Sequence, residues 1–327
     1  MEELMTINNS EVITDIEVSG ISDSRFMVAN TQSIPYQLLK QKCTIPVFAK
    51  DNESTISHQE LIDIIGDAAS LAFPNERILD PAVRVSHPIK GRIPSAVAKP
   101  ANELREHEKT IYYERMAFVY EIPSIEETVN GNRLSLTVGG VRAYNLENLY
   151  GRKSEERFKV FVGFKNWLCV NLCVSTDGLQ GDLRARTTQE LLNRAFQLFA
   201  MFNAQKHLNI LRNLADYGLN EHQFAQLIGR LRMYPYLKSS LKIGIPALEL
   251  GDSQVNTVIR DYYKDTSFCR DSEGNISLWK LYNLLTGANK SSYIDTFLDR
   301  TVNALSFTQV LLNSLKNGQY LWYLDGQ

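Results

Sequence analysis

The chain has 327 residues, 44% of them hydrophobic and 22% charged, so it can bury a large core and its composition excludes wholesale disorder. Its formal net charge of −2 lacks the basic surplus of proteins that coat nucleic acid non-specifically. The N-terminus is acidic and polar, which predicts neither a signal nor a transit peptide. The most apolar window, Ala195–Phe202, is far shorter than the about 20 residues of a membrane span. We therefore expect a cytoplasmic protein with no membrane partner.

Three regions follow one another along the chain. Residues 1–40 lack a steady hydrophobic period, and we expect a weakly ordered segment or a tail laid on the body. Residues 41–186 are predicted to form a β-rich α+β region, and residues 187–327 a helical region packed on the sheet. No linker separates these last two regions, so the sequence also allows one continuous domain. The predicted fold class is α+β, with a central, mainly antiparallel sheet and a helical C-terminal half.

The first predicted elements are a strand and a helix. Thr44–Ala49 has the composition of a strand, with a polar turn behind it. Ser57 and Glu60 have the spacing of a capping box, in which both side chains accept backbone amides at the start of a helix. Apolar residues then recur at helical spacing. We expect an amphipathic helix over residues 58–72, with His58 as an ordinary surface residue.

Residues 84–102 form a basic segment, with four cationic side chains, three prolines and no acidic residue. The prolines favour an extended chain. Such a segment is either a linker on the surface or a basic arm on nucleic acid. We favour the linker, because four dispersed charges neutralise few phosphates. If it is an arm, we expect Lys90 and Arg92 to contact phosphate.

From residue 110 to residue 186 the pattern is that of strands. Asn130-Gly131 is a strong hairpin signal, because both central positions of a type I′ turn need a positive φ. Gly139-Gly140 interrupts the strand behind this turn and predicts a bulge or a close approach of two backbones. Phe158–Lys165 and Leu168–Ser175 are expected to be further strands.

After residue 187 the hydrophobic period is helical to the end. Thr187, Asn220 and Ser277 lie where three helices are expected to begin, because their side chains accept the first free amides. A further helix is expected to start near Ser291, and Gly287 to end the helix before it.

The four cysteines are too sparse for a disulfide framework, which favours a reducing compartment. On a helix, Cys169 and Cys173 would form half of a metal site, but their surroundings predict a strand. Four residues of strand separate the two sulfurs by about 13 Å, which is too far for them to share an ion. We expect no metal and no cofactor.

No nucleophile elbow, metal motif or phosphate-binding loop is present in the sequence, so we do not expect an enzyme. Catalysis would need a site assembled from residues distant in sequence. The candidates are His87 in the basic segment, Asn171 beside the cysteines, and Asp295, one helical turn from Asp299.

Arg184 and Arg186 alternate with an alanine, so an extended chain directs both guanidinium groups to one side. Tyr112, Tyr113 and Tyr144 are candidates for stacking faces nearby. Arginine on a sheet beside aromatic side chains is typical of single-strand binders. It is equally typical of an ordinary solvated sheet edge.

Five segments closely resemble the bacterial family known as domain of unknown function 3871, over about residues 40–320. They are VSHPIKGRIP (85–94), HEKTIYYERMAF (107–118), GGVRAYNLENLY (139–150), GFKNWLCVNLCVSTDG (163–178) and the block at 268–300.

A looser likeness is to the phage/plasmid-like family known as domain of unknown function 932. It rests on the predicted strand with Asn166, Cys169 and Asn171 and on the helix that contains Asn283. The Asn-Ser-His-Asp-Gly-Ser signature of that wider family is absent here, so a charge relay through its histidine is not carried over. Members of both families are associated with mobile elements. The resemblance therefore implies a role in replication, recombination or transfer, without an assigned catalytic residue.

The leading hypothesis is a non-enzymatic protein of mobile-element DNA metabolism that binds single-stranded DNA or a replication or recombination partner. Lys90, Arg92, Arg184 and Arg186 would then contact phosphates. Two alternatives stay open. One is a protein-interaction scaffold without nucleic-acid contact, which would use an exposed patch from the 15 Tyr, 14 Phe and 3 Trp. The other is an enzyme with an unrecognised site.

Overall fold

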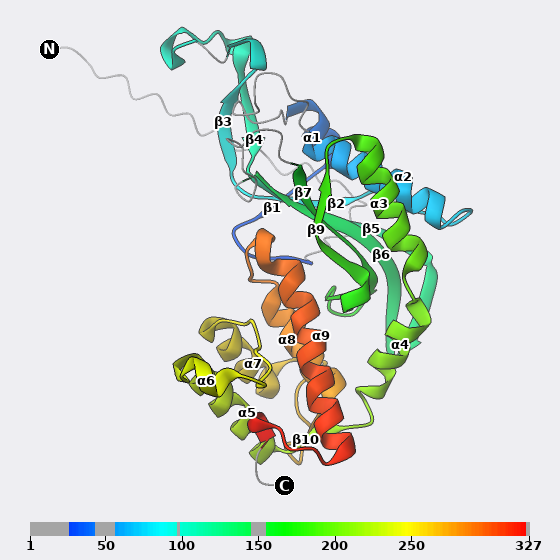
Figure 1. Cartoon of the computed structure of the whole chain (residues 1–327), viewed down its shortest axis with the longest axis vertical. Helices are drawn as coiled ribbons and strands as arrows, with labels where there is room; N and C mark the ends of the chain where they lie inside the picture. Colours follow the sequence, from blue (N-terminus) through cyan, green and yellow to red (C-terminus); the bar gives the residue numbers. More distant parts are fainter. Residues whose placement is uncertain (1–25, 43–55, 97–98, 145–154, 325–327) are drawn as a thin grey trace, which may run out of the picture.

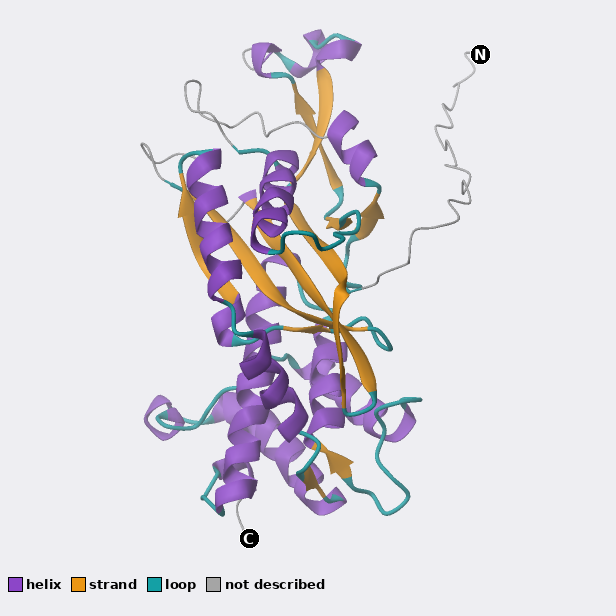
Figure 2. Ribbon diagram, turned by 90° about the vertical axis from the view of Figure 1, so that its right-hand side faces the viewer, coloured by secondary structure: helices purple, strands orange, loops and turns teal. Residues whose placement is uncertain are grey.

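The computed structural model describes residues 26–42, 56–96, 99–144 and 155–324. A curled antiparallel sheet fills one half of the molecule, and helices from the C-terminal part of the chain fill the other half (Figures 1 and 2). The α+β class and the helical C-terminal half are therefore confirmed. The predicted strand at residues 44–49 lies outside the described residues.

The main sheet has the order β1-β2-β5-β6-β7-β8, with β9 also paired to β7, and neighbouring strands in it run antiparallel. The hairpin predicted at Asn130-Gly131 joins β5 to β6, and both residues have a positive φ, 49° and 76°. The strands are β1 Gln32–Ile34, β2 Ala82–Val85, β5 Arg115–Val129, β6 Asn132–Ala143, β7 Glu156–Asn166, β8 Leu172–Cys173 and β9 Leu179–Ala185.

The glycine pair in β6 marks a close approach of backbones, as predicted. A Cβ atom on Gly140 would lie 2.8 Å from the carbonyl oxygen of Lys159 on β7. Any side chain at this position would therefore push the two strands apart.

Helices cover both faces of the sheet. On one face, α2 (His58–Ala72) and α3 (Thr188–Met201) pack against side chains such as Phe118 and Val160 in the larger hydrophobic cluster. On the other face, the first turns of α9 (Ile294–Asn317) pack against Phe161 in a smaller cluster. The alternation of the strands thus supplies one set of apolar side chains to each layer.

The helix over residues 58–72 has the predicted bounds, and its Ser57–Glu60 capping box is confirmed. The assignment of His58 to the surface was wrong, because this residue is only 1% exposed. Its Nε2 lies 2.7 Å from the carbonyl oxygen of Tyr113, so the start of α2 is turned into the protein. The cap pattern predicts where a helix begins but not which face it buries.

The basic segment is not a linker. After β2 the chain forms β3 (Pro88–Arg92), which pairs with β4 (Lys109–Tyr113) in a separate two-stranded ribbon. The ribbon and the short 3₁₀ turns between its strands extend to one end of the molecule (Figure 1). Within the segment expected to be weakly ordered, the described residues form β1 and most of α1 (Tyr36–Lys42).

The C-terminal helices begin largely where their caps predict. The side chains of Thr187, Asn220 and Ser277 each accept an amide in the first turn of their helix. Gly287 does not end a helix, because α8 continues to Asn289, whereas α9 begins at Ile294, close to the start expected near Ser291. The remaining elements are α4 Ala204–Asn213, β10 Gly218–Leu219, α5 Glu221–Met233, α6 Ser239–Lys242, α7 Asp252–Lys264, β11 Ile276–Ser277 and α8 Leu278–Asn289.

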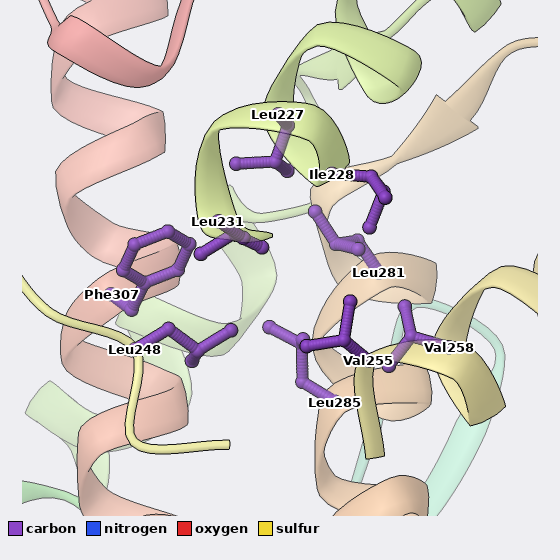
Figure 3. Close-up of a pocket in the computed structure, with 9 residues that line it drawn as sticks. All are labelled: Leu227, Ile228, Leu231, Leu248, Val255, Val258, Leu281, Leu285 and Phe307. Carbon is purple, nitrogen blue, oxygen red and sulfur yellow. The ribbon is translucent and has the colours of Figure 1, made fainter. Parts of the chain in front are cut away.

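One large cluster of buried side chains runs from Ile34 to Leu324 and joins the sheet to the helices. Within it, α5, α7, α8 and α9 enclose a small pocket whose nine lining side chains are all apolar (Figure 3). Its volume of about 10 Å³ is no more than one water molecule needs, so it is a packing gap and not a ligand site. Among the described helices, none is both long and apolar enough to cross a membrane.

Candidate functional site

Arg184 and Arg186 are exposed at β9, where they alternate with the buried Leu183 and Ala185 as predicted. Both lie beside carboxylates. The Nε and Nη2 atoms of Arg184 donate to Asp182 at 3.0 and 2.9 Å, and Nε of Arg186 lies 3.6 Å from Glu155. The hydrogen bond from Arg184 holds the pKa of Asp182 below its usual value, so this carboxylate stays charged. Much of the positive charge at this edge is thus already compensated.

Lys90 and Arg92 lie on β3, in a different sheet from β9. Lys90 is exposed, whereas Arg92 is half-buried and donates to the carbonyl oxygens of Ala96 and Lys99. The four cationic candidates therefore belong to two separate sheets, and only some of their charge faces solvent. The three tyrosines proposed as stacking faces are 7%, 4% and 3% exposed, so their rings are unavailable to a nucleobase. They are Tyr112, Tyr113 and Tyr144.

Asn171 belongs to a group of buried amides that fixes the end of β7 to α8. Asn166 donates to Oδ1 of Asn283 at 3.1 Å, and Asn171 donates to the carbonyl oxygen of Asn283 at 2.9 Å. Asn283 itself donates to the carbonyl oxygen of Trp279 at 2.9 Å. We call Asn166, Asn171 and Asn283 the asparagine junction. Its bonds are those of a structural clamp between sheet and helix.

The predicted strand at Leu168–Ser175 was wrong in its first half. Only Leu172–Cys173 pairs in the sheet, and Val170 has φ 58°, a left-handed conformation that is strained for a β-branched residue. Burial raises the pKa of the Cys169 thiol to about 11 and that of Cys173 to about 12. Both therefore stay protonated at neutral pH, which suits neither a nucleophile nor a metal ligand. In the described part of the chain, no three metal-binding side chains gather.

The other two candidates for an enzyme site lie elsewhere. His87 is exposed just before β3. Asp295 lies in the first turn of α9, where its backbone carbonyl accepts a bond from Lys159 at 2.6 Å. No hydrogen bond or ion pair among the described residues joins any two of His87, Asn171 and Asp295.

A buried charged group at the start of α2 was missed by the sequence analysis. The Arg142 side chain is fully buried, and it forms an ion pair with Glu156 and donates to the carbonyl oxygen of Ile56. Its guanidinium also lies 4.5 Å from the Tyr144 ring, and this ring packs against His58 at 4.6 Å with a tilt of 32°. This group links β6, β7 and α2 and has the contacts of a buried structural ion pair.

A surface that the sequence analysis also missed lies at α6. We call residues 232–243, from the end of α5 through α6, the α6 prominence; it is drawn in yellow-green and yellow at one side of the helical half (Figure 1). Four exposed apolar side chains in so short a segment exceed the single exposed residues of ordinary surfaces. They are Met233 (59% exposed), Tyr236 (87%), Leu241 (59%) and Ile243 (83%).

The same prominence is positively charged. Between Glu221 and Glu249 the sequence contains four cations and no acidic residue. Among the residues that the structure describes, no carboxylate pairs with Arg232, Lys238 or Lys242. Arg232 donates to the amide oxygen of Asn256, and Lys242 donates to the carbonyl oxygen of Pro235 at 3.0 Å. Unlike the arginines of β9, Arg232, Lys238 and Lys242 therefore have no carboxylate beside them within the described ranges.

The family model described as "Domain of unknown function, B. Theta Gene description (DUF3871)" matches residues 6–324. The chain belongs to this family. No curated protein and no solved structure matches the chain. The looser likeness to the domain of unknown function 932 stays a prediction.

In this member of DUF3871, two of the segments that carried the resemblance supply buried contacts between the sheet and the helices. GGVRAYN contributes the buried Arg142, and GFKNWLCVNLCVSTDG contributes two of the three amides of the asparagine junction. The α6 prominence lies outside all five segments. Its only sequence signal was the run without acidic residues from residue 222 to residue 248.

Proposed function

We propose that this protein is a non-enzymatic interaction protein that docks a partner protein on the α6 prominence. The observation that carries the proposal is that one short segment combines exposed apolar side chains with cations that pair with no carboxylate of the described residues. A replication or recombination protein of a mobile element is the class of partner that the family resemblance favours.

Physical chemistry supports a docking role for these side chains. Burying Leu241 and Ile243 against a partner would contribute roughly 3–6 kcal/mol before the entropic cost of association. Neither side chain serves the core, because each keeps more than half of its surface in water. The neighbouring cations would select an acidic partner surface and speed its approach.

The test is affinity capture with the tagged full-length protein in the organism that makes it. The double variant Leu241→Asp/Ile243→Asp places two carboxylates on the docking surface. We expect partner recovery to fall at least about tenfold, a change of about 1.4 kcal/mol in binding free energy. Leu71→Asp on α2 is the matched control, because Leu71 is also 59% exposed. It should leave partner recovery unchanged.

Thermal unfolding of all three proteins shows whether each variant folds, since surface changes are expected to stay within about 0.5 kcal/mol. If the parent and both variants recover the same proteins in the same amounts, the prominence is not a docking surface and the proposal is wrong.

Binding of single-stranded DNA is the second candidate, and exposed Lys90 on the projecting ribbon favours it. Fluorescence anisotropy with labelled oligothymidine tests it over a range of salt concentrations. Replacing Lys90, Arg92, Arg184 and Arg186 by Ala should lower the affinity and flatten its salt dependence. Lys90→Ala/Arg92→Ala should account for most of this change, because carboxylates already compensate the other two charges. Unchanged binding in the fourfold variant, or no binding by the parent, rejects this role.

A further inference from the structure

The α6 prominence is fixed to the body at both ends. Tyr234, at its start, lies 6.4 Å from the rings of both Trp322 and Tyr323. The hydroxyl of Tyr323 donates to the carbonyl oxygen of Pro246, just beyond the prominence, at 2.8 Å. Its exposed side chains therefore lie on an anchored backbone, which reduces the ordering cost of binding to it.

One segment of the same chain has the complementary chemistry. Residues 1–25 contain six carboxylates and a single arginine, whereas the prominence carries cations without acidic residues. The segment EVITDIEV (11–18) alternates apolar and acidic side chains in the way that a mixed apolar and cationic surface would bind. Both the charge and the apolar character of the two segments therefore match.

Residues 1–25 continue into Phe26, and from there they are long enough to reach the α6 prominence. Phe26, the first described residue, is buried and lies 6.3 Å from the ring of Phe297, in the first turns of α9. The prominence lies toward the other end of α9, where Tyr323 packs on Phe307 at 5.1 Å. A helix of 24 residues is about 36 Å long, and 25 extended residues span up to roughly 80 Å. The chain is long enough to cover this distance.

We propose that residues 1–25 bind the α6 prominence of the same molecule, with their carboxylates beside Arg232, Lys238 and Lys242. The proposal rests on the docking role of the prominence and names the chemistry of what docks there: an acidic segment with interspersed aliphatic side chains. A partner protein would then compete with the chain's own N-terminal segment for one surface.

Photo-cross-linking in the full-length protein tests this contact. Benzoyl-phenylalanine replaces Tyr236 on the prominence or, as the matched control, Tyr263 on α7, which is 52% exposed. We expect cross-links from position 236, but not from position 263, to peptides within residues 1–25, at the mass of a single chain. Glu11→Gln/Asp15→Asn/Glu17→Gln should reduce the yield severalfold, as should 1 M salt, where the screening length falls to about 3 Å.

Three results would overturn the proposal: no cross-link from position 236 to residues 1–25, an equal yield from position 263, or a yield unaffected by the charge substitutions. Cross-links found only between two chains would assign the surface to a second copy instead. Partner capture separates the two proposals. If the Leu241→Asp/Ile243→Asp variant loses its partner while the cross-link is absent, only the N-terminal contact is wrong.

Discussion

His207 is a buried histidine whose ring packs on two aromatic side chains, Phe164 at 5.6 Å and Phe202 at 5.8 Å. Burial lowers its pKa to about 4, from the 6.5 of an exposed histidine. At His58, burial and then the charge of Arg142 lower the pKa to about 3. Both rings are therefore neutral in the folded protein at pH values where the unfolded chain binds protons.

The sign of the resulting pH dependence follows from this difference. Below pH 6.5 the unfolded chain binds more protons than the folded one, so the free energy of unfolding falls as the pH is lowered toward 4. For His207 the loss over this range is roughly 3 kcal/mol. We expect His207→Phe, whose ring suits the same aromatic surroundings, to remove that share of the dependence in urea unfolding at several pH values. His222→Phe, at an exposed position, should keep the slope of the parent; an unchanged slope in His207→Phe contradicts the assignment.

At the scale of elements, the asparagine junction is the contact that holds the end of β7 to α8. Asn283→Ala removes the acceptor of Asn166 and of the Cys169 thiol, and it leaves a buried amide without its partner. We expect a loss of roughly 2–4 kcal/mol in the free energy of unfolding, measured by urea denaturation. In Asn193→Ala, which removes an acceptor on the exposed face of α3, the change should stay within about 0.5 kcal/mol. Equal effects of the two substitutions would show that the junction is not a clamp.

The elements that the sequence predicted well are those that local chemistry decides. The Ser57 cap and the Asn130-Gly131 turn each act within a few residues, so their patterns suffice. The strand predicted at Leu168–Ser175 was wrong in its first half, where Cys169 and Asn171 bond to Asn283 on α8, more than 100 positions away. The prediction of a linker for the basic segment was wrong because prolines favour an extended chain equally in a linker and in a ribbon.

At the scale of the whole molecule, the sequence predicted the fold class, but it did not predict which cationic side chains are compensated by carboxylates. The side to which Arg184 and Arg186 point follows from alternation alone. Their compensation depends on Asp182 and on Glu155, just before β7, and thus on how β9 lies beside β7. The apolar residues of the α6 prominence could not be told from core residues, because a sequence does not show which side of a turn meets the body.

Phe26 and Met27 are 2% and 0% exposed and fill the face of the sheet beside α9. The first two described residues are therefore part of the hydrophobic core and fill the space between the sheet and α9. A chain that starts after residue 27 would have an apolar cavity beside Phe297, whereas in a chain that starts at residue 25 this cavity would stay filled. Any trimmed version meant for crystallisation should respect that boundary.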